Sequence, residues 1–144
     1  MGRLLAALAL LFAAAPALAL DYLSLNEAAV MYDAPSLKAS PIYAVARATP
    51  VEVVVAVVGW VKVRDASGSL AWLERRVLSD KRTVLVTAAR AQVRAKPDAN
   101  APLLFEAEKD VVLDLVEATQ DGWAKVKHRD GQEGYVRANQ VWGL

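Results

Sequence analysis

The chain has 144 residues, too few for two ordinary domains of about 100–150 residues but enough for two very small ones. It carries 17 Lys and Arg against 16 Asp and Glu, a formal charge of +1. This balance excludes a nucleic-acid binder that neutralises phosphates, because such a protein needs a basic surplus. The lack of Cys excludes disulfides and thiolate sites, and a single His excludes a His-rich metal centre. We therefore expect no cofactor and no metal.

The N-terminus has the form of a secretory signal peptide. Arg3 precedes an almost unbroken Leu/Ala/Phe run that closes with Ala17-Leu18-Ala19. We expect cleavage after Ala19, which would leave a periplasmic or secreted chain without a membrane span. An uncleaved anchor is the alternative, because Leu4–Leu20 has 17 residues and about 17–25 apolar residues cross a bilayer.

The remaining chain is a duplicated unit. Ala34-Pro35 matches Lys96-Pro97 at an offset of 62, and an offset of 63 holds from the two Gly-Trp-x-Lys-Val motifs onward. An offset that changes by one across a variable loop indicates two small domains in tandem. We expect a signal peptide at 1–19, a divergent first domain at 20–79 and a second domain at 80–144. The pairs at offset 63 are Gly59/Gly122, Trp60/Trp123, Lys62/Lys125, Gly68/Gly131 and Trp72/Tyr135.

The apolar residues of each unit alternate with a period of two. The runs at 51–58 and 111–117 are rich in β-branched residues, and neither unit has a convincing amphipathic helix. Short, closely spaced strands predict an all-β fold of two small barrels. Thr83–Thr87 at the join is also predicted as a strand, so the units should pack against each other.

The turn at Arg129-Asp130-Gly131 allows two strand registers. A two-residue loop would mix apolar and charged side chains on both faces, whereas a three-residue loop with left-handed Gly131 sets Val136 opposite Ala124, inside. Tyr135 then lies opposite Lys125, outside. The same register in the first unit sets Leu73 opposite Val61 inside and Trp72 opposite Lys62 outside.

This register predicts a pair of outward aromatic rings in each unit. Trp123 and Tyr135 are diagonal neighbours about 7–8 Å apart, and Trp60 stands likewise to Trp72. Burying such a ring is worth roughly 2 kcal/mol or more, so exposed rings indicate a binding face. The alternative is that the rings of one unit pack against the other unit or the connecting segment.

Each unit resembles a bacterial SH3-like domain, a small barrel related to the Src-homology-3 fold. The resemblance covers essentially the whole mature chain and is clearest in the second unit; in the first, Met31-Tyr32 replaces Val-Arg and Ala71 replaces the Gly before the aromatic. It implies an adaptor or cell-wall-associated module. Of the three groove residues that bind proline-rich peptides in eukaryotic relatives, only the Trp is matched. The residues that carry the resemblance are 91–97, 121–126, 130–136 and 141–144.

Catalytic or metal sites have few candidates. His128 beside Asp130 could serve as a general base, but a lone turn His without a pocket is more often structural. Glu106, Glu108 and Asp110 could ligate a cation or form a solvated loop. We therefore expect no enzyme; a small hydrolase would require an unrecognised site around these residues.

The sequence thus predicts a non-catalytic binding module of the bacterial cell envelope. Its partner would be a cell-wall polymer such as peptidoglycan, whose sugar rings or stem peptide would stack on the aromatic face while Lys125 or Arg137 meets a carboxylate. The alternative is a periplasmic protein–protein adaptor that uses the same face or the cleft between the units. The candidate ligand-binding residues are Trp60, Trp72, Trp123, Lys125, Tyr135 and Arg137.

Overall fold

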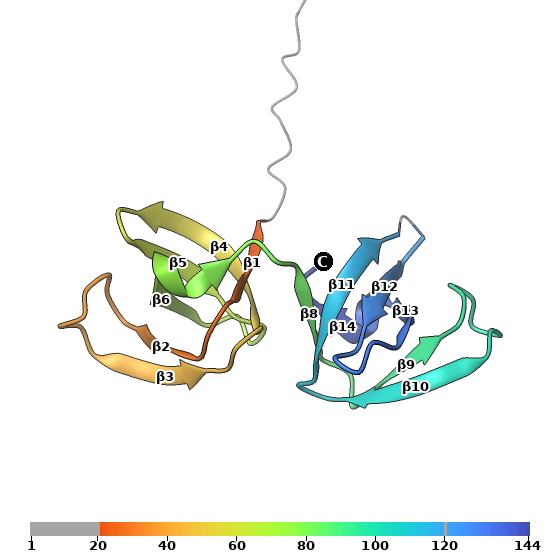
Figure 1. Cartoon of the computed structure of the whole chain (residues 1–144). Helices are drawn as coiled ribbons and strands as arrows, with labels where there is room; N and C mark the ends of the chain where they lie inside the picture. Colours follow the sequence, from red (N-terminus) through yellow and green to blue (C-terminus); the bar gives the residue numbers. More distant parts are fainter. Residues whose placement is uncertain (1–20, 120) are drawn as a thin grey trace, which may run out of the picture.

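The computed structural model describes residues 21–119 and 121–144, which form two seven-stranded antiparallel sheets (Figure 1). The predicted all-β fold of two tandem barrels is confirmed, whereas the predicted signal peptide lies outside the described residues. The first sheet contains β1 (Tyr22–Leu25), β2 (Ala29–Tyr32), β3 (Pro41–Val45), β4 (Pro50–Val57), β5 (Trp60–Arg64), β6 (Leu70–Glu74) and β7 (Leu78–Ser79). The second contains β8 (Thr83–Val86), β9 (Arg90–Arg94), β10 (Leu103–Glu108), β11 (Val112–Ala118), β12 (Trp123–Lys127), β13 (Glu133–Arg137) and β14 (Val141–Trp142).

The two sheets have the same topology. The strand order is β3-β2-β6-β5-β4-β1-β7 in the first and β10-β9-β13-β12-β11-β8-β14 in the second, so each strand has a counterpart seven positions later. Two 3-10 turns, η1 (Arg75–Val77) and η2 (Ala138–Gln140), precede the last strand of each sheet. Within the described residues, no helix has the length and apolar character needed to cross a membrane.

Each sheet curls around a core of its own. The first core is built from alternate, β-branched or aliphatic residues such as Val51, Val61 and Leu73, and the second from Val126, Val136 and their neighbours. The alternation arises because successive side chains of a strand point to opposite faces. The polar positions between them remain on the outside of each barrel.

The predicted hairpin register is confirmed in both barrels. Ala124 pairs with Val136 and Lys125 with Tyr135, and the first barrel repeats this with Val61–Leu73 and Lys62–Trp72. The turn has the predicted three-residue loop: the amide of His128 donates to the carbonyl of Gln132 at 2.9 Å, and Gly131 has a φ of +93°. Gly68 takes the same place in the first barrel with a φ of +89°.

The sequence difference between Gly134 and Ala71 has a packing cause. A Cβ on Gly134 would lie 2.5 Å from Cγ1 of Val93 and 2.9 Å from the carbonyl oxygen of Arg94. In the first barrel the residue matching Val93 is Met31, whose unbranched side chain can bend away from a methyl group. The first barrel therefore tolerates Ala71 where the second needs glycine.

The barrels pack against each other, as predicted. The hydroxyl of Thr83 donates to the carbonyl of Ala48 at 2.7 Å, and that of Ser24 donates to the carbonyl of Lys81 at 2.7 Å. Both side chains are almost fully buried. The rings of Tyr22 and Trp142 meet edge to face, with centroids 5.3 Å apart, and Arg82 lies over the Tyr22 ring at 5.4 Å. The same arginine donates to the carbonyl of Gly143 at 2.7 Å.

We predict that Gly134→Ala destabilises the second barrel by about 1–3 kcal/mol, because the added methyl group would clash with Val93 and overpack the core. The reciprocal change, Ala71→Gly, should cost the first barrel less than about 1 kcal/mol. Urea unfolding of both variants measures the difference. A Gly134→Ala midpoint equal to wild type would show that the close approach to Val93 is absent.

The contact between the two barrels, which we call the joint, should weaken at alkaline pH. Burial raises the pKa of the Tyr22 phenol, and the nearby Glu52 carboxylate raises it further. The unfolded chain therefore ionises first, near a pH of about 10, and the stability contributed by the neutral phenol is lost as pH rises through the folded pKa. We predict that Tyr22→Phe loses less stability than wild type between about pH 9 and pH 11. Parallel urea-midpoint curves would contradict this.

Candidate functional site

The outer face of the first barrel carries a continuous row of side chains across four strands. Val55 on β4 pairs with Lys62 on β5, which pairs with Trp72 on β6, and Trp72 in turn pairs with Tyr32 on β2. Directly opposite residues in an antiparallel pair point to the same side. Trp60 lies two residues before Lys62 and joins the same face. We call Tyr32, Trp60, Lys62 and Trp72 the first aromatic face.

The rings of this face are half-buried, and two of them pack against each other. Tyr32 and Trp60 meet edge to face with centroids 5.6 Å apart and an interplanar angle of 84°. Such pairs stabilise an aromatic cluster beyond the area they bury. Lys62 is also half-buried, and its strand partner on this face is Trp72. The predicted outward pair of Trp60 and Trp72 thus has a third ring, Tyr32.

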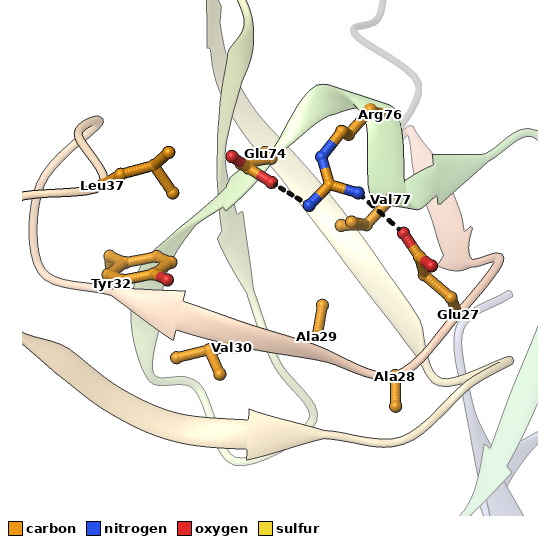
Figure 2. A pocket seen from close by; sticks show the side chains of 9 residues that line it. All are labelled: Glu27, Ala28, Ala29, Val30, Tyr32, Leu37, Glu74, Arg76 and Val77. Atoms are coloured by element: carbon orange, nitrogen blue, oxygen red, sulfur yellow. Dashed lines mark hydrogen bonds and ion pairs between the residues drawn. The ribbon is translucent and has the colours of Figure 1, made fainter.

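A pocket of about 250 Å³ adjoins the first aromatic face. Figure 2 shows Tyr32 and Leu37 at one end of it and the Arg76 ion pairs at the other. Arg76 contacts Glu74 at 2.7 Å and Glu27 at 2.9 Å. The pocket therefore has an apolar end and a charged end that offers both acceptors and donors. Its lining residues are Glu27, Ala28, Ala29, Val30, Tyr32, Leu37, Glu74, Arg76 and Val77.

The expectation of an exposed Trp123 is wrong. Trp123 is only 7% exposed, although it does not belong to the hydrophobic core of the second barrel. Its strand partner is Arg137, whose guanidinium lies 4.8 Å from the centre of the indole. A guanidinium stacks well on an indole face because it is planar and weakly hydrated. The arginine side chain thus covers a ring that the strand register places on the outer face.

The rest of the second outer face is charged. Glu117, Lys125, Tyr135 and Arg94 form the row that matches Val55, Lys62, Trp72 and Tyr32 of the first barrel. The ammonium of Lys125 lies 6.0 Å from the centre of the Tyr135 ring and 3.6 Å from the carboxylate of Glu133. Tyr135 is half-buried and Arg137 is exposed. Four predicted residues therefore lie together, but they present one ring instead of two.

The candidate residues for catalysis and metal binding contact neighbouring side chains of the barrel. The imidazole of His128 lies 3.2 Å from the Asp130 carboxylate and packs edge to face on Phe105, at 5.7 Å between ring centres. The amide of Gln132 donates to Asp130, and this hydrogen bond, with a smaller effect of His128, lowers the pKa of the carboxyl. Glu106 pairs with Arg90 at 3.6 Å. In the part of the chain that the structure describes, no three His, Asp or Glu side chains cluster as a metal site.

Sequence reasoning missed the pocket and the third ring. Tyr32 stood out only as a departure from the Val-Arg pattern of the second unit. Leu37 and Val30, which are 66% and 39% exposed, lie in the variable loop and on β2, where no pattern marks them. The repeat could have indicated Tyr32. It matches Arg94 at an offset of 62, so the first unit has an aromatic residue where the second has a charged one.

The profile of the bacterial SH3 domain family matches residues 26–80 and 87–143. The chain belongs to this family. Bacterial SH3 domains are generally cell-wall binding modules, typically non-catalytic and extracellular or periplasmic. No curated protein is similar enough to the chain to count as a match.

Several solved structures are similar to these tandem SH3 domains. NlpC2 from Trichomonas vaginalis is 14% identical with a TM-score of 0.39, and the match covers 86% of this chain and 48% of that protein. An NlpC/P60 family protein from Bacillus cereus is 17% identical with a TM-score of 0.38, covering 84% of this chain and 55% of the other. The chain thus spans about half the length of these proteins.

We predict that Arg137→Ala uncovers Trp123. The indole N–H of Trp123 should exchange with solvent faster, and the second barrel should lose about 0.5–1 kcal/mol, the worth of an exposed cation–π contact. Indole N–H exchange measured by NMR tests this, with Arg129→Ala in the exposed turn as the matched control. Unchanged exchange in Arg137→Ala would show that another group covers the ring.

Proposed function

We propose that the chain is a non-catalytic module that binds peptidoglycan through the outer faces of its two SH3 domains, with the first aromatic face as the principal site. The observation that carries the proposal is the row of Tyr32, Trp72 and Lys62, half-buried on the outer face, with Tyr32 lining a 250 Å³ pocket. Family membership supports the same class of ligand.

The chemistry of the first aromatic face suits a glycan with an attached peptide. Flat aromatic rings stack on the apolar faces of sugar rings, and such rings lose little conformational entropy on binding. Lys62 beside Trp72 could pair with a lactyl or stem-peptide carboxylate through a charge-assisted hydrogen bond. At the charged end of the pocket, Glu74 and Glu27 offer acceptors for hydroxyl or amine groups.

The second SH3 domain would contribute a weaker, more polar contact. Tyr135 offers one ring, and Lys125 and Arg137 offer cations for a carboxylate, as the sequence suggested. Trp123 would act beneath the surface as the platform on which Arg137 is held. Because the two faces belong to one chain, binding to a repeating polymer at both would raise the overall affinity without new contacts.

Export to the periplasm or the cell surface belongs to the proposal, since peptidoglycan lies outside the cytoplasmic membrane. The apolar run at the N-terminus supports it. The chain would act without an active site of its own: the one histidine is engaged by Asp130 and Phe105 in a turn that lines neither of the two described pockets.

A second candidate function is a protein adaptor, and one observation favours it. A pocket of about 270 Å³ lies between the barrels, lined mainly by β3 and the 65–67 turn of the first and by Leu85 and Asp110 of the second. It lies next to the edge strand β3, whose Ile42 and Tyr43 are exposed. An edge strand beside an apolar pocket can receive an extended peptide.

Retention on purified peptidoglycan sacculi tests the proposal. Wild type should co-sediment with sacculi, and the double variant Tyr32→Ala/Trp72→Ala should lose most of this binding, at least tenfold in affinity if each ring contributes about 1 kcal/mol. Tyr135→Ala should reduce retention less. Near-ultraviolet circular dichroism confirms that each variant is folded.

The matched control is Tyr43→Ala, which removes an exposed ring at the inter-barrel pocket. It should bind sacculi like wild type. If wild type is not retained, peptidoglycan binding is refuted; if Tyr43→Ala loses binding while Tyr32→Ala/Trp72→Ala keeps it, the site lies between the barrels.

A further inference from the structure

The hairpin that joins β4 to β5 ends in an apolar tip that the proposed function does not use. Val54, Val55 and Val57 are 39%, 46% and 46% exposed, and Val58 at the apex is 100% exposed. Ala56, whose partner Val61 is buried in the core, is exposed as well. Both sides of the tip therefore face solvent. We call Val54–Val58 the apolar tip.

Folding does not require this composition. Among the described residues, β4 pairs with β1 as far as Glu52, and beyond Val53, whose amide donates to Asp21, the hairpin has a strand neighbour on one side alone. The matching hairpin of the second barrel, between β11 and β12, has the same bulge and is one residue longer, and it carries Glu117, Thr119 and Asp121. One template thus tolerates polar residues at these places, and the valines of the first barrel need another explanation.

Two cationic residues lie along the hairpin. Lys62 pairs with Val55 across the hairpin, and the amide of Arg75 donates to the carbonyl of Gly59 at 2.9 Å, which holds this arginine beside the turn. Among the described residues, no carboxylate lies within ion-pair distance of Lys62 or Arg75. A protruding apolar tip with cations behind it is complementary to a bilayer with anionic headgroups.

Asp21, the residue before β1, lies at the same end of the sheet. The amide of Val53 donates to the carbonyl of Asp21 at 2.8 Å, and β1 is antiparallel to β4. Asp21 therefore lies at the end of β1 toward which β4 runs, and the apolar tip lies farther along in that direction. At about 3.3 Å per strand residue, Val58 is about 17 Å along the strand from that junction. As the leader that the sequence predicts, residues 1–19 would occupy the membrane during export and would bring Asp21 and the apolar tip near the lipid surface at that stage.

We propose that the apolar tip docks the protein on an anionic phospholipid bilayer, with Val57 and Val58 inserted among the headgroups and Lys62 and Arg75 against phosphates. The contact is peripheral and reversible, because four valines bury far less apolar surface than a spanning segment. It leaves Tyr32 and Trp72, farther along the sheet, for a different ligand. The proposal does not rest on peptidoglycan binding, although the two contacts share Lys62, which also belongs to the first aromatic face.

The lack of Cys allows a site-specific test. Val58→Cys and Asp121→Cys place one thiol at the equivalent positions of the two hairpins, and each is labelled with an environment-sensitive fluorophore in the full chain as exported. With vesicles of phosphatidylcholine and phosphatidylglycerol, the label at position 58 should shift to shorter wavelength and brighten several-fold. The label at position 121 should not change. Urea midpoints show that both variants are folded.

The controls separate insertion from other causes. Pure phosphatidylcholine vesicles, high salt and Lys62→Gln/Arg75→Gln should each weaken the response. Val55→Thr/Val57→Thr, which keeps β-propensity, should weaken it as well. An unchanged label at position 58 overturns the proposal. Equal responses at both positions also overturn it, since the leader alone then brings the chain to the surface. A response to lipid-free envelope protein but not to vesicles assigns the tip to a protein partner instead.

Discussion

Strand register is the constraint on which both binding faces depend. In each barrel a three-residue turn closes with a glycine at positive φ, Gly68 or Gly131, and this turn fixes which residues of the following strands stand opposite each other. Because side chains alternate, a slip of one residue would exchange the core with the surface. Val61, Leu73, Ala124 and Val136 lie inside for the same reason that the aromatic residues lie outside.

Within this shared register the two copies have diverged in what their outer faces present. The first shows three rings, one lysine and an apolar hairpin, whereas the second shows one ring among Arg94, Glu117 and Lys125. The divergence reaches into the core, where Met31 allows Ala71 and Val93 requires Gly134. A duplication with a common scaffold and different surfaces suits a protein whose two domains make unequal contacts.

Much of this architecture could be predicted from the sequence. The period of two, the turn glycines and the repeated Gly-Trp-x-Lys-Val motif were enough for the all-β fold and for the pairing of Lys125 with Tyr135. The burial of Trp123 was not predictable, because it depends on Arg137 folding over the ring, and register alone says nothing of what a long side chain covers. The pocket beside Tyr32 was not predictable for a similar reason. It is lined by Leu37 and Arg76, which are far apart in the sequence and reach one pocket only in the fold.

We propose that the strand register presents the first aromatic face for ligand binding. The most direct measurement is NMR of the tryptophan indole N–H groups during titration with soluble muropeptides. Saturable shifts at Trp60 and Trp72, with Trp142 at the joint unmoved, are the predicted result. Shifts confined to residues around the inter-barrel pocket, or none at all at concentrations that saturate sacculi binding, would contradict the claim.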